Sequence, residues 1–376
     1  MQKSNRIIWL DAARSIAIIS ISLNHAINRS FNISYDQITE YLTIPVSLTI
    51  FKTVVYVLSR IGVPLFVMIS GALLLHRDYE EKPFQFLKHN WLNLFITTEI
   101  WLVIMFWYKQ LLPGSILSSA GITTCLYRFI LTLLFLNPVD MYSMWYMYMI
   151  LCVYLVIPII STGLKHINRK YFIYPALLVV IGSFLIPDVN GLLGALGVSM
   201  TLTFSLASKH VFSMYVVYLL LGYYLVHLSG LKRFKTKTII CFGILSFSAY
   251  CLFQFWIFTK EYDYTIGYNS IFPMLVSVCV FELLQRSNYS AIIKKITAEL
   301  ARISFGIYFI HICIMEGLVV VLDYTGWNIT YLYRFLFLEL LSFLGSVVII
   351  ITLDKIKWIR DLDKNGWIKQ YVLGIK

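Results

Sequence analysis

A cluster of ionisable side chains lies near the start of the chain, inside a long apolar run. Asp11, Arg14 and His25 all occur within residues 7–28. In a helix that turns 100° per residue, Arg14 and His25 lie within about 20° of each other, and Asp11 lies within about 40° of His25. Residues of these types can exchange protons and bind anions. The spacing also fits an i,i+3 ion pair with a histidine at the helix end, and the residues alone leave both interpretations open.

A second polar group occurs late in the chain. Tyr308 and His311 each fall within about 40° of Ser304 on a helical wheel, which predicts a polar stripe on an otherwise apolar helix. Glu316 falls on a different face and needs a partner of its own. A histidine that simply hydrogen-bonds to nearby backbone would give the same pattern, so this stripe has a structural interpretation as well.

The composition predicts that these residues lie in a membrane. Of the 376 residues, 59% are hydrophobic and only 13% are charged, whereas soluble domains have about 45–50% and about 25%. This balance excludes a cytosolic enzyme, a disordered chain and a secreted disulfide scaffold. The six cysteines are scattered without a C-x-x-C pair, which favours neither a disulfide framework nor a metal site.

Ten apolar runs are long enough, or nearly so, to cross a bilayer. We therefore expect an all-α, polytopic membrane helix bundle of about ten transmembrane helices, forming a single domain over residues 1–376 with no appended soluble domain. Three interrupted apolar stretches, 41–51, 115–137 and 192–208, are candidates for interfacial or re-entrant helices. The predicted spans are 7–28, 53–75, 91–112, 144–161, 171–187, 211–228, 238–258, 270–285, 303–322 and 333–353.

The distribution of lysine and arginine predicts the orientation. With a cytoplasmic amino terminus, the inner segments carry about three times as many of these residues as the outer segments, where Lys52 is placed. Both termini are therefore expected in the cytoplasm. The same bias accounts for the net charge of +12, because the excess lies beside an anionic inner leaflet. We expect the lipid bilayer as a partner and no nucleic acid.

Four motifs in order along the chain identify a family. The sequence resembles membrane-bound acyltransferase family 3, the integral O-acyltransferases that modify bacterial surface polysaccharides, from the first span to the ninth. The motifs that carry this resemblance are Leu10-Asp11-Ala-Ala-Arg14 with His25, the Arg-x-Gly-Val-Pro-Leu-Phe-x-Met-Ile-Ser-Gly segment at 60–71, Trp145-Tyr146, and Ile303-Ser304-Phe-Gly-Ile-Tyr308-Phe-Ile-His311.

The resemblance implies an enzyme of the bacterial plasma membrane whose activity depends on Arg14 and His25. An acyl group, expected to be acetyl, would pass from cytoplasmic acyl-CoA to a hydroxyl of a cell-surface or lipid-linked polysaccharide. Arg14 suits the phosphates of the donor. His25 suits a general base, or it accepts the acyl group first, and the sequence leaves both open. Asp11 would position Arg14. Acyl-CoA is a substrate, and neither a resident cofactor nor a metal is expected.

Some family features differ here. Residues 86–93 lack the R-x-x-R pair that members often carry before the third span, so Lys88 and His89 are expected to supply the positive charge for the donor. We expect none of the extra extracytoplasmic domain that some members carry, so acceptor choice is expected to rest with the spans and outer loops. The residues expected to line the cavity are Arg60, Ser70, Trp145, Tyr146, Ser304, Tyr308, His311 and Glu316.

Two other functions compete with acyl transfer. A polysaccharide polymerase or exporter is also a bundle of ten or more aromatic-rich spans, but it predicts large outer loops with catalytic or glycan-binding residues. The outer segments here carry few charges. A small-molecule transporter predicts inverted repeats with broken helices in matching halves, and no such repeat is evident.

Overall fold

The computed structural model is all-α over the residues that it describes. These are residues 7–31, 33, 44–81, 83–136, 144–168, 171, 173–198, 202, 213–228, 230–260, 265–356 and 368–372, and no strand occurs among them. Long helices satisfy the backbone within one segment, which is what a chain surrounded by hydrocarbon requires. The predicted fold class is confirmed. The orientation of the termini stays a prediction.

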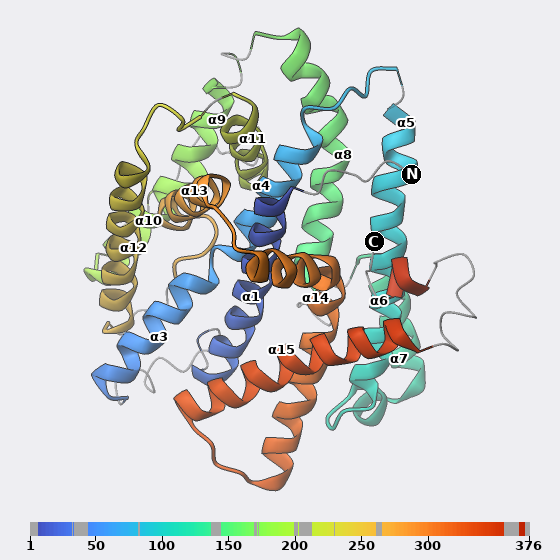
Figure 1. Cartoon of the computed structure of the whole chain (residues 1–376). Coiled ribbons are helices and arrows are strands. Elements are labelled where there is room, and N and C mark those ends of the chain that lie inside the picture. Colours follow the sequence, from blue (N-terminus) through green and yellow to red (C-terminus); the bar gives the residue numbers. More distant parts are fainter. Residues whose placement is uncertain are drawn as a thin grey trace. The chain divides into compact units, whose positions relative to one another are not determined.

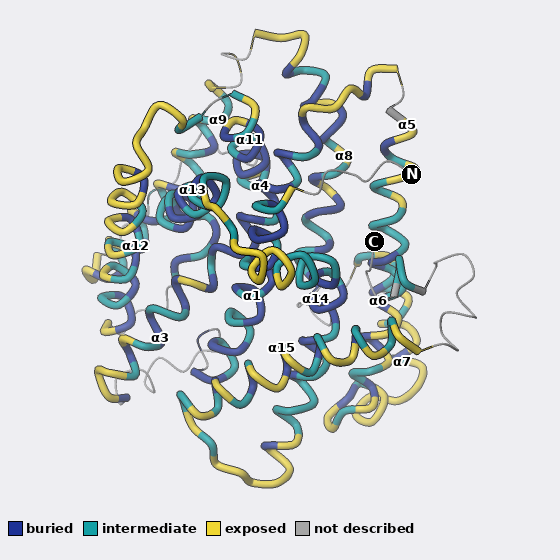
Figure 2. The backbone as a smooth tube through the Cα atoms, viewed as in Figure 1, coloured by how far each residue is buried: buried dark blue, intermediate teal, exposed yellow. Residues whose placement is uncertain are grey.

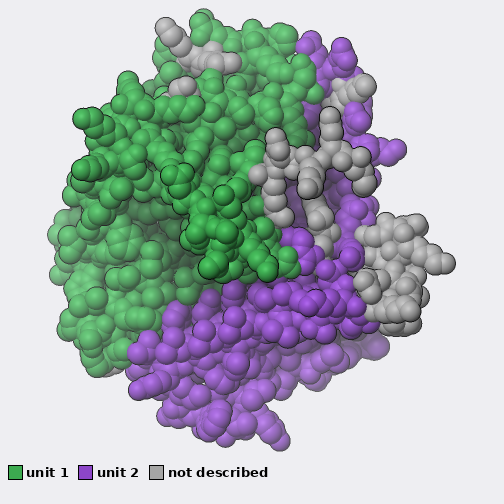
Figure 3. Space-filling model, viewed as in Figure 1, with its two compact units in different colours: residues 1–78, 159–301 green, residues 79–158, 302–376 purple. Residues whose placement is uncertain are grey.

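The chain divides into two compact units, which Figure 3 colours green and purple. Unit 1 comprises residues 1–78 and 159–301, and unit 2 comprises residues 79–158 and 302–376. The boundaries between the units fall within α8 (Trp145–His166) and α14 (Ala291–Thr325). The other helices of unit 1 are α1 (Ile8–Phe31), α3 (Val46–Ser59), α4 (Gly62–Leu74), α9 (Ile173–Val180), η4 (Ile181–Leu185), α10 (Ile186–Ala195), α11 (Met214–His227), α12 (Thr236–Phe258) and α13 (Ile271–Arg286), and those of unit 2 are α5 (Pro83–Phe86), η1 (Leu87–Trp91), α6 (Leu92–Gln110), α7 (Ile116–Leu133), α15 (Tyr331–Lys355) and η6 (Ile368–Val372).

Eight helices in the described part of the chain are long and apolar enough to cross a membrane. All ten predicted spans overlap helices (Figure 1). The helices of three predicted spans, α1, α11 and α13, are not among these eight. Helices α11 and α13 are short, with 14 and 16 residues, and α1 carries ionisable groups that lower its hydropathy. The chain is a multi-pass membrane protein. The eight spans are Val46–Leu74, Phe84–Gln110, Ile116–Leu133, Trp145–His166, Ile173–Ala195, Thr236–Phe258, Ala291–Thr325 and Tyr331–Lys355.

Two of the three interrupted stretches, which were expected to be interfacial or re-entrant helices, belong to candidate membrane spans. Residues 46–51 open α3, so the second span begins at Val46 and contains Lys52, which the sequence had assigned to an outer segment. Stretch 115–137 contains α7, a candidate span broken at Gly121, where a φ of +78° interrupts the helix. In the third stretch, residues 192–195 end α10, and most of the rest lies outside the described residues.

Small residues hold the helices of unit 1 close together. A Cβ at Gly71 of α4 would overlap the backbone carbonyl of Leu219 in α11, and one at Gly222 of α11 would overlap that of Met68 in α4. Glycine pairs of this kind let membrane helices approach until their backbones touch. Pro64 lies in the first turn of α4, where its missing N–H removes no intrahelical hydrogen bond.

Exposed apolar side chains mark the surface that meets lipid. In unit 1, α12 exposes Leu245 and Leu252 to 66% and 70%, whereas α1 is largely buried along its length (Figure 2). In unit 2, α15 exposes Tyr333 and Val348. An apolar outer face with polar groups inside is the pattern expected of helices surrounded by hydrocarbon. The polar residues of α1 therefore lie inside their unit.

Candidate functional site

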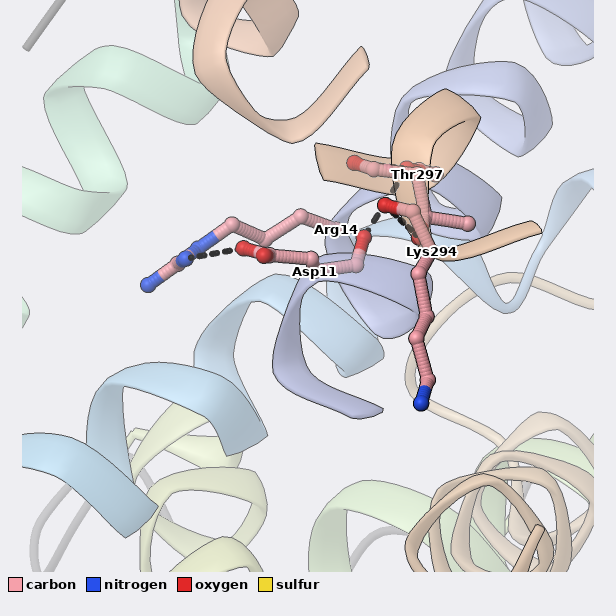
Figure 4. Close-up of polar contacts among 5 residues, drawn as sticks. Asp11, Arg14, Lys294 and Thr297 are labelled. Carbon is pink, nitrogen blue, oxygen red and sulfur yellow. Dashed lines mark hydrogen bonds and ion pairs between the residues drawn. The ribbon is translucent and has the colours of Figure 1, made fainter. Parts of the chain in front are cut away.

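The first half of α1 holds an ion pair. The Nη1 atom of Arg14 lies 3.3 Å from Oδ1 of Asp11, one turn earlier, and Figure 4 shows the two side chains directed toward each other. The Asp11 side chain is only 5% exposed, whereas that of Arg14 is 32% exposed. The aspartate is thus the buried partner, and the arginine retains an accessible edge that can bind a further anion.

Ser15 ties this part of α1 to α14 within unit 1. Its hydroxyl lies 2.8 Å from the carbonyl oxygen of Asp11 and 3.1 Å from that of Thr297. Figure 4 shows Thr297 beside the ion pair and the Lys294 side chain directed away from it. The hydroxyl therefore fixes the position of the Asp11–Arg14 pair against a neighbouring helix.

His25 lies toward the other end of the same continuous helix. Eleven residues of α-helix separate it from Arg14, or about 16.5 Å along the axis. On the face between them, Ile18 is 0% exposed and Ile21 is 4% exposed. Because apolar side chains on this face are covered, the side of α1 that carries Arg14 and His25 faces protein and not lipid. Both polar residues are half-buried.

Residues next to His25 meet the middle of the second span, Val46–Leu74. Ser59, the last residue of α3, donates its hydroxyl to Oδ1 of Asn24 at 3.3 Å, and Asn28 donates to the same oxygen at 3.4 Å. Farther along, a Cβ at Gly62 would lie 2.7 Å from the carbonyl oxygen of Ala17. The Arg-x-Gly-Val-Pro motif therefore crosses α1 between its two polar ends.

Arg60 and Ser70 belong to this second span. Arg60 lies at the break between α3 and α4 and donates from Nη2 to the hydroxyl of Tyr56 at 2.6 Å. Its guanidinium carbon lies 4.4 Å from the ring centroid of Tyr56 and 5.2 Å from that of Tyr268. Ser70 donates to the carbonyl of Phe66 one turn earlier. Arg60 is thus set among aromatic rings, and Ser70 hydrogen-bonds within its own helix.

An aromatic cluster in unit 2 brings together another part of the predicted site. The rings of Trp145 and Tyr146 lie 6.2 Å apart, those of Tyr146 and Tyr308 lie 5.6 Å apart, and those of Tyr308 and His311 lie 6.4 Å apart. Ser304 is 5% exposed and lies one turn before Tyr308 on α14. These five residues come from α8 and α14 and form one cluster.

His311 makes the backbone hydrogen bond that the structural interpretation of the polar stripe predicts. The residue is fully buried, and its Nδ1 lies 2.7 Å from the carbonyl oxygen of Ile307, to which it can donate. Glu316 has the partner that its position requires, because Nζ of Lys109 lies 3.6 Å from its carboxylate. Both contacts lie within unit 2, and the expectation that these two side chains line the cavity stays a prediction.

Lys88 and His89 lie on the π-helical turn η1, at the start of the third predicted span. Both are exposed, and Nδ1 of His89 lies 2.9 Å from the carbonyl oxygen of Gln85. Their charges are thus accessible at one end of the span. An anionic donor could contact them there.

The predicted site residues fall into two groups, one in each unit. Asp11, Arg14, His25, Arg60 and Ser70 lie in unit 1, and the remaining ones lie in unit 2. Sequence reasoning missed the tyrosines around Arg60. Only Tyr56 carried a signal, because it precedes Arg60 by four residues. Among the described residues, no group of three His, Cys, Asp or Glu side chains is placed to hold a metal.

The comparison with known families covers nearly the whole chain. A family model described as an acyltransferase domain matches residues 7–351, which include every predicted site residue. Neither a curated protein nor a solved structure matches significantly. The matched range starts just before α1 and ends within α15, so it contains the first nine predicted spans and all but the last two residues of the tenth. This protein belongs to acyltransferase family 3.

Proposed function

We propose that the protein is an O-acyltransferase of the bacterial plasma membrane that transfers an acyl group, expected to be acetyl, from acyl-CoA to a hydroxyl of a cell-surface or lipid-linked polysaccharide. One observation carries the proposal: in a chain of this family, a single unbroken helix presents Arg14 and His25 on one protein-facing side. The two groups lie about 16.5 Å apart along the helix. Arg14 therefore suits the phosphates of the donor, and His25 suits the place where the acceptor hydroxyl meets the thioester.

In this proposal Arg14 binds a phosphate of the donor. A guanidinium presents paired N–H groups that match a phosphate, and Asp11 holds the group by an ion pair. Because Asp11 is nearly covered, it also fixes which edge of the guanidinium stays available. Lys88 and His89 are a second, accessible source of positive charge for the donor.

His25 is the proposed general base. A hydroxyl is a weak nucleophile until its proton is removed, and an imidazole titrates close to neutral pH. His25 takes the proton as the acceptor oxygen attacks the thioester carbonyl. The tetrahedral intermediate then expels the thiolate of CoA, and the imidazolium returns the proton to that sulfur. The products are an ester and free CoA.

A covalent route uses the same residue differently. The imidazole of His25 first attacks the thioester and releases CoA, and the acyl-imidazole then passes its acyl group to the hydroxyl. The two routes differ in one measurement: acid-quenched protein incubated with labelled acyl-CoA but no acceptor carries label on His25 only in the covalent route.

The proposed function is tested by the ester content of surface glycans. A strain without this chain is expected to lose alkali-labile O-acyl groups from one surface polysaccharide, and the wild-type chain is expected to restore them. The His25→Ala variant, present at the same level in the membrane, should not restore them. Unchanged ester content in the deletion strain would contradict the proposal.

A further inference from the structure

A stripe of cationic and aromatic residues runs along one face of α3. Lys52, Tyr56 and Arg60 follow one another at intervals of four residues, so each is rotated by only about 40° from the last. The contacts of all three involve residues that lie after position 249 in the chain, namely Tyr250, Phe258, Ile266 and Tyr268. We call Tyr56, Arg60 and Tyr268 the arginine cage.

The backbone segment that completes the cage is firmly held. The carbonyl oxygen of Ile266 accepts hydrogen bonds from the hydroxyls of Tyr56 and Tyr250 at 3.1 and 3.0 Å, and its N–H donates to Gln254 at 2.9 Å. The carbonyl of Tyr268 accepts from the hydroxyl of Tyr218 at 3.0 Å. Ring positions in the cage are therefore fixed before any ligand arrives.

Arg60 uses few of its hydrogen-bond donors. Nη2 donates to Tyr56, whereas Nε is buried and has no acceptor among the residues that the structure describes. No carboxylate in the described part of the chain lies within ion-pair distance of this guanidinium. Arg60 is half-buried, so part of the side chain remains accessible. Its positive charge is thus balanced only by the faces of aromatic rings.

The position of Arg60 in the membrane span makes the lack of a carboxylate partner among the described residues unusual. It is the middle residue of the 29-residue span Val46–Leu74, where a charge requires a partner or water. Arg286, another arginine of unit 1, has such a partner, because it lies 2.7 Å from a carboxylate oxygen of Glu282. Lys52, which is 0% exposed and lies 3.9 Å from the ring centroid of Phe258, adds a second positive charge on the same face. The field along α3 favours an anion.

We propose that the arginine cage binds the carboxylate of an acidic sugar in the acyl acceptor. The planar guanidinium can hold a carboxylate through two parallel hydrogen bonds. The buried rings of Tyr56 and Tyr268 contact the guanidinium, so they set its orientation before the carboxylate binds. This inference rests on the proposed function, because it names the class of acceptor, a polysaccharide that contains uronic acid.

The neighbourhood of the cage favours the acceptor over the donor. Ser59, next to Arg60, is hydrogen-bonded to Asn24, next to His25. Both substrates must reach His25, but the phosphates of the donor are assigned to Arg14, about 16.5 Å along the helix, so an anion held near His25 belongs to the acceptor.

Saturation-transfer NMR on the purified full-length protein in detergent tests the proposal without acyl transfer. The probes are glucuronic acid and glucose at equal ionic strength, which differ by one carboxylate. The variants are Arg60→Gln and Arg60→Lys. The matched control is Arg233→Gln, because Arg233 also lies over an aromatic ring, at 4.9 Å from Phe234, but is exposed.

We expect saturation of glucuronic acid but not of glucose, with binding about tenfold weaker in Arg60→Gln, as the loss of a charge-assisted pair implies. Arg60→Lys should also bind more weakly, and it serves as the test if Arg60→Gln does not fold. Arg233→Gln should bind as the wild type does. Equal saturation by both sugars, or unchanged binding in both Arg60 variants, would overturn the proposal.

Two further results separate this inference from the proposed function. Displacement of glucuronic acid from the wild-type protein by CoA would assign the cage to the donor and overturn the inference alone. Glucuronic acid binding at Arg60 in a protein that transfers no acyl group to any glycan would support the cage as an anion site while contradicting the proposed function.

Discussion

Two arginines of unit 1, Arg14 and Arg60, lie in predicted membrane spans, and their positive charges are stabilised in opposite ways. Arg14 is paired with Asp11 at 3.3 Å on an unbroken helix. Arg60 lies at a break between two helices and contacts Tyr56 and Tyr268 without a carboxylate partner in the described residues. The first charge is balanced before a ligand binds, whereas the second is not.

This difference separates two ways of holding an arginine in a membrane. A buried aspartate neutralises Arg14 and orients it, so removing either partner leaves a charge without compensation. Aromatic faces attract Arg60 but cancel less of its charge, because a cation–π contact contributes about 0.5–2 kcal/mol against an insertion cost of about 2.5–3.5 kcal/mol. The unbalanced arginine is the one expected to gain most from an anionic ligand.

The largest expected effect is that of Arg14→Gln. The change leaves the Asp11 carboxylate, 5% exposed, without its cation, and it removes the proposed phosphate contact. We expect acyl transfer to fall by about 100-fold or more, comparable to the loss of other catalytic groups, and the free energy of unfolding to fall by about 1–2 kcal/mol, less than for a fully buried pair because Arg14 is partly exposed. Initial rates and thermal unfolding in detergent measure both.

The double variant Asp11→Asn/Arg14→Gln is the control for this prediction. It removes both charges, so the thermal midpoint should return toward that of the wild type while acyl transfer stays low. Recovery of activity together with stability would mean that Arg14 has only a structural role.

Arg60→Gln is expected to affect stability in the opposite sense. Because Arg60 has no carboxylate partner among the described residues, removing its charge relieves a desolvation cost and leaves no buried anion of that part of the chain behind. The thermal midpoint should stay equal or rise, while the KM for an acidic acceptor increases by about tenfold, as expected for a lost charge-assisted pair. A strong fall in the midpoint would contradict the contrast between the two arginines.

Ser15→Ala should have the smallest effect. The change removes the hydroxyl that lies 3.1 Å from the carbonyl of Thr297 and so loosens α1 from α14 without touching either charge. A cost of about 0.6–1 kcal/mol is expected in the free energy of unfolding, because hydrogen bonds between membrane helices are modest. Acyl transfer should fall less than twofold, and a larger loss would show that the position of the ion pair limits the rate.

The sequence predicted the features of the site that depend on local helix geometry. Arg14 and His25 share a face of α1 because eleven residues make nearly three turns, whatever the rest of the fold does. The ion pair of Asp11 with Arg14 followed from their spacing in the same way. The family resemblance rested on motifs that the family match confirms over residues 7–351.

The surroundings of Arg60 could not be predicted in this way. Tyr250 and Tyr268 come from residues far along the chain, and only packing places them beside α3. Lys52 misled the prediction because a lysine normally ends a span, whereas here the stem and ammonium are buried against Phe258. Hydropathy registers the charge of a side chain but not the aromatic ring that stabilises it.

The central claim, that His25 performs acyl transfer, is tested most directly by the rate of a single variant. Purified protein in lipid nanodiscs, with labelled acetyl-CoA and surface glycan from the deletion strain as acceptor, should form alkali-labile labelled ester. We predict that His25→Ala lowers the initial rate by at least about 100-fold, the range for loss of a general base or nucleophile, while the thermal midpoint stays close to that of the wild type. A wild-type rate in His25→Ala would contradict the account.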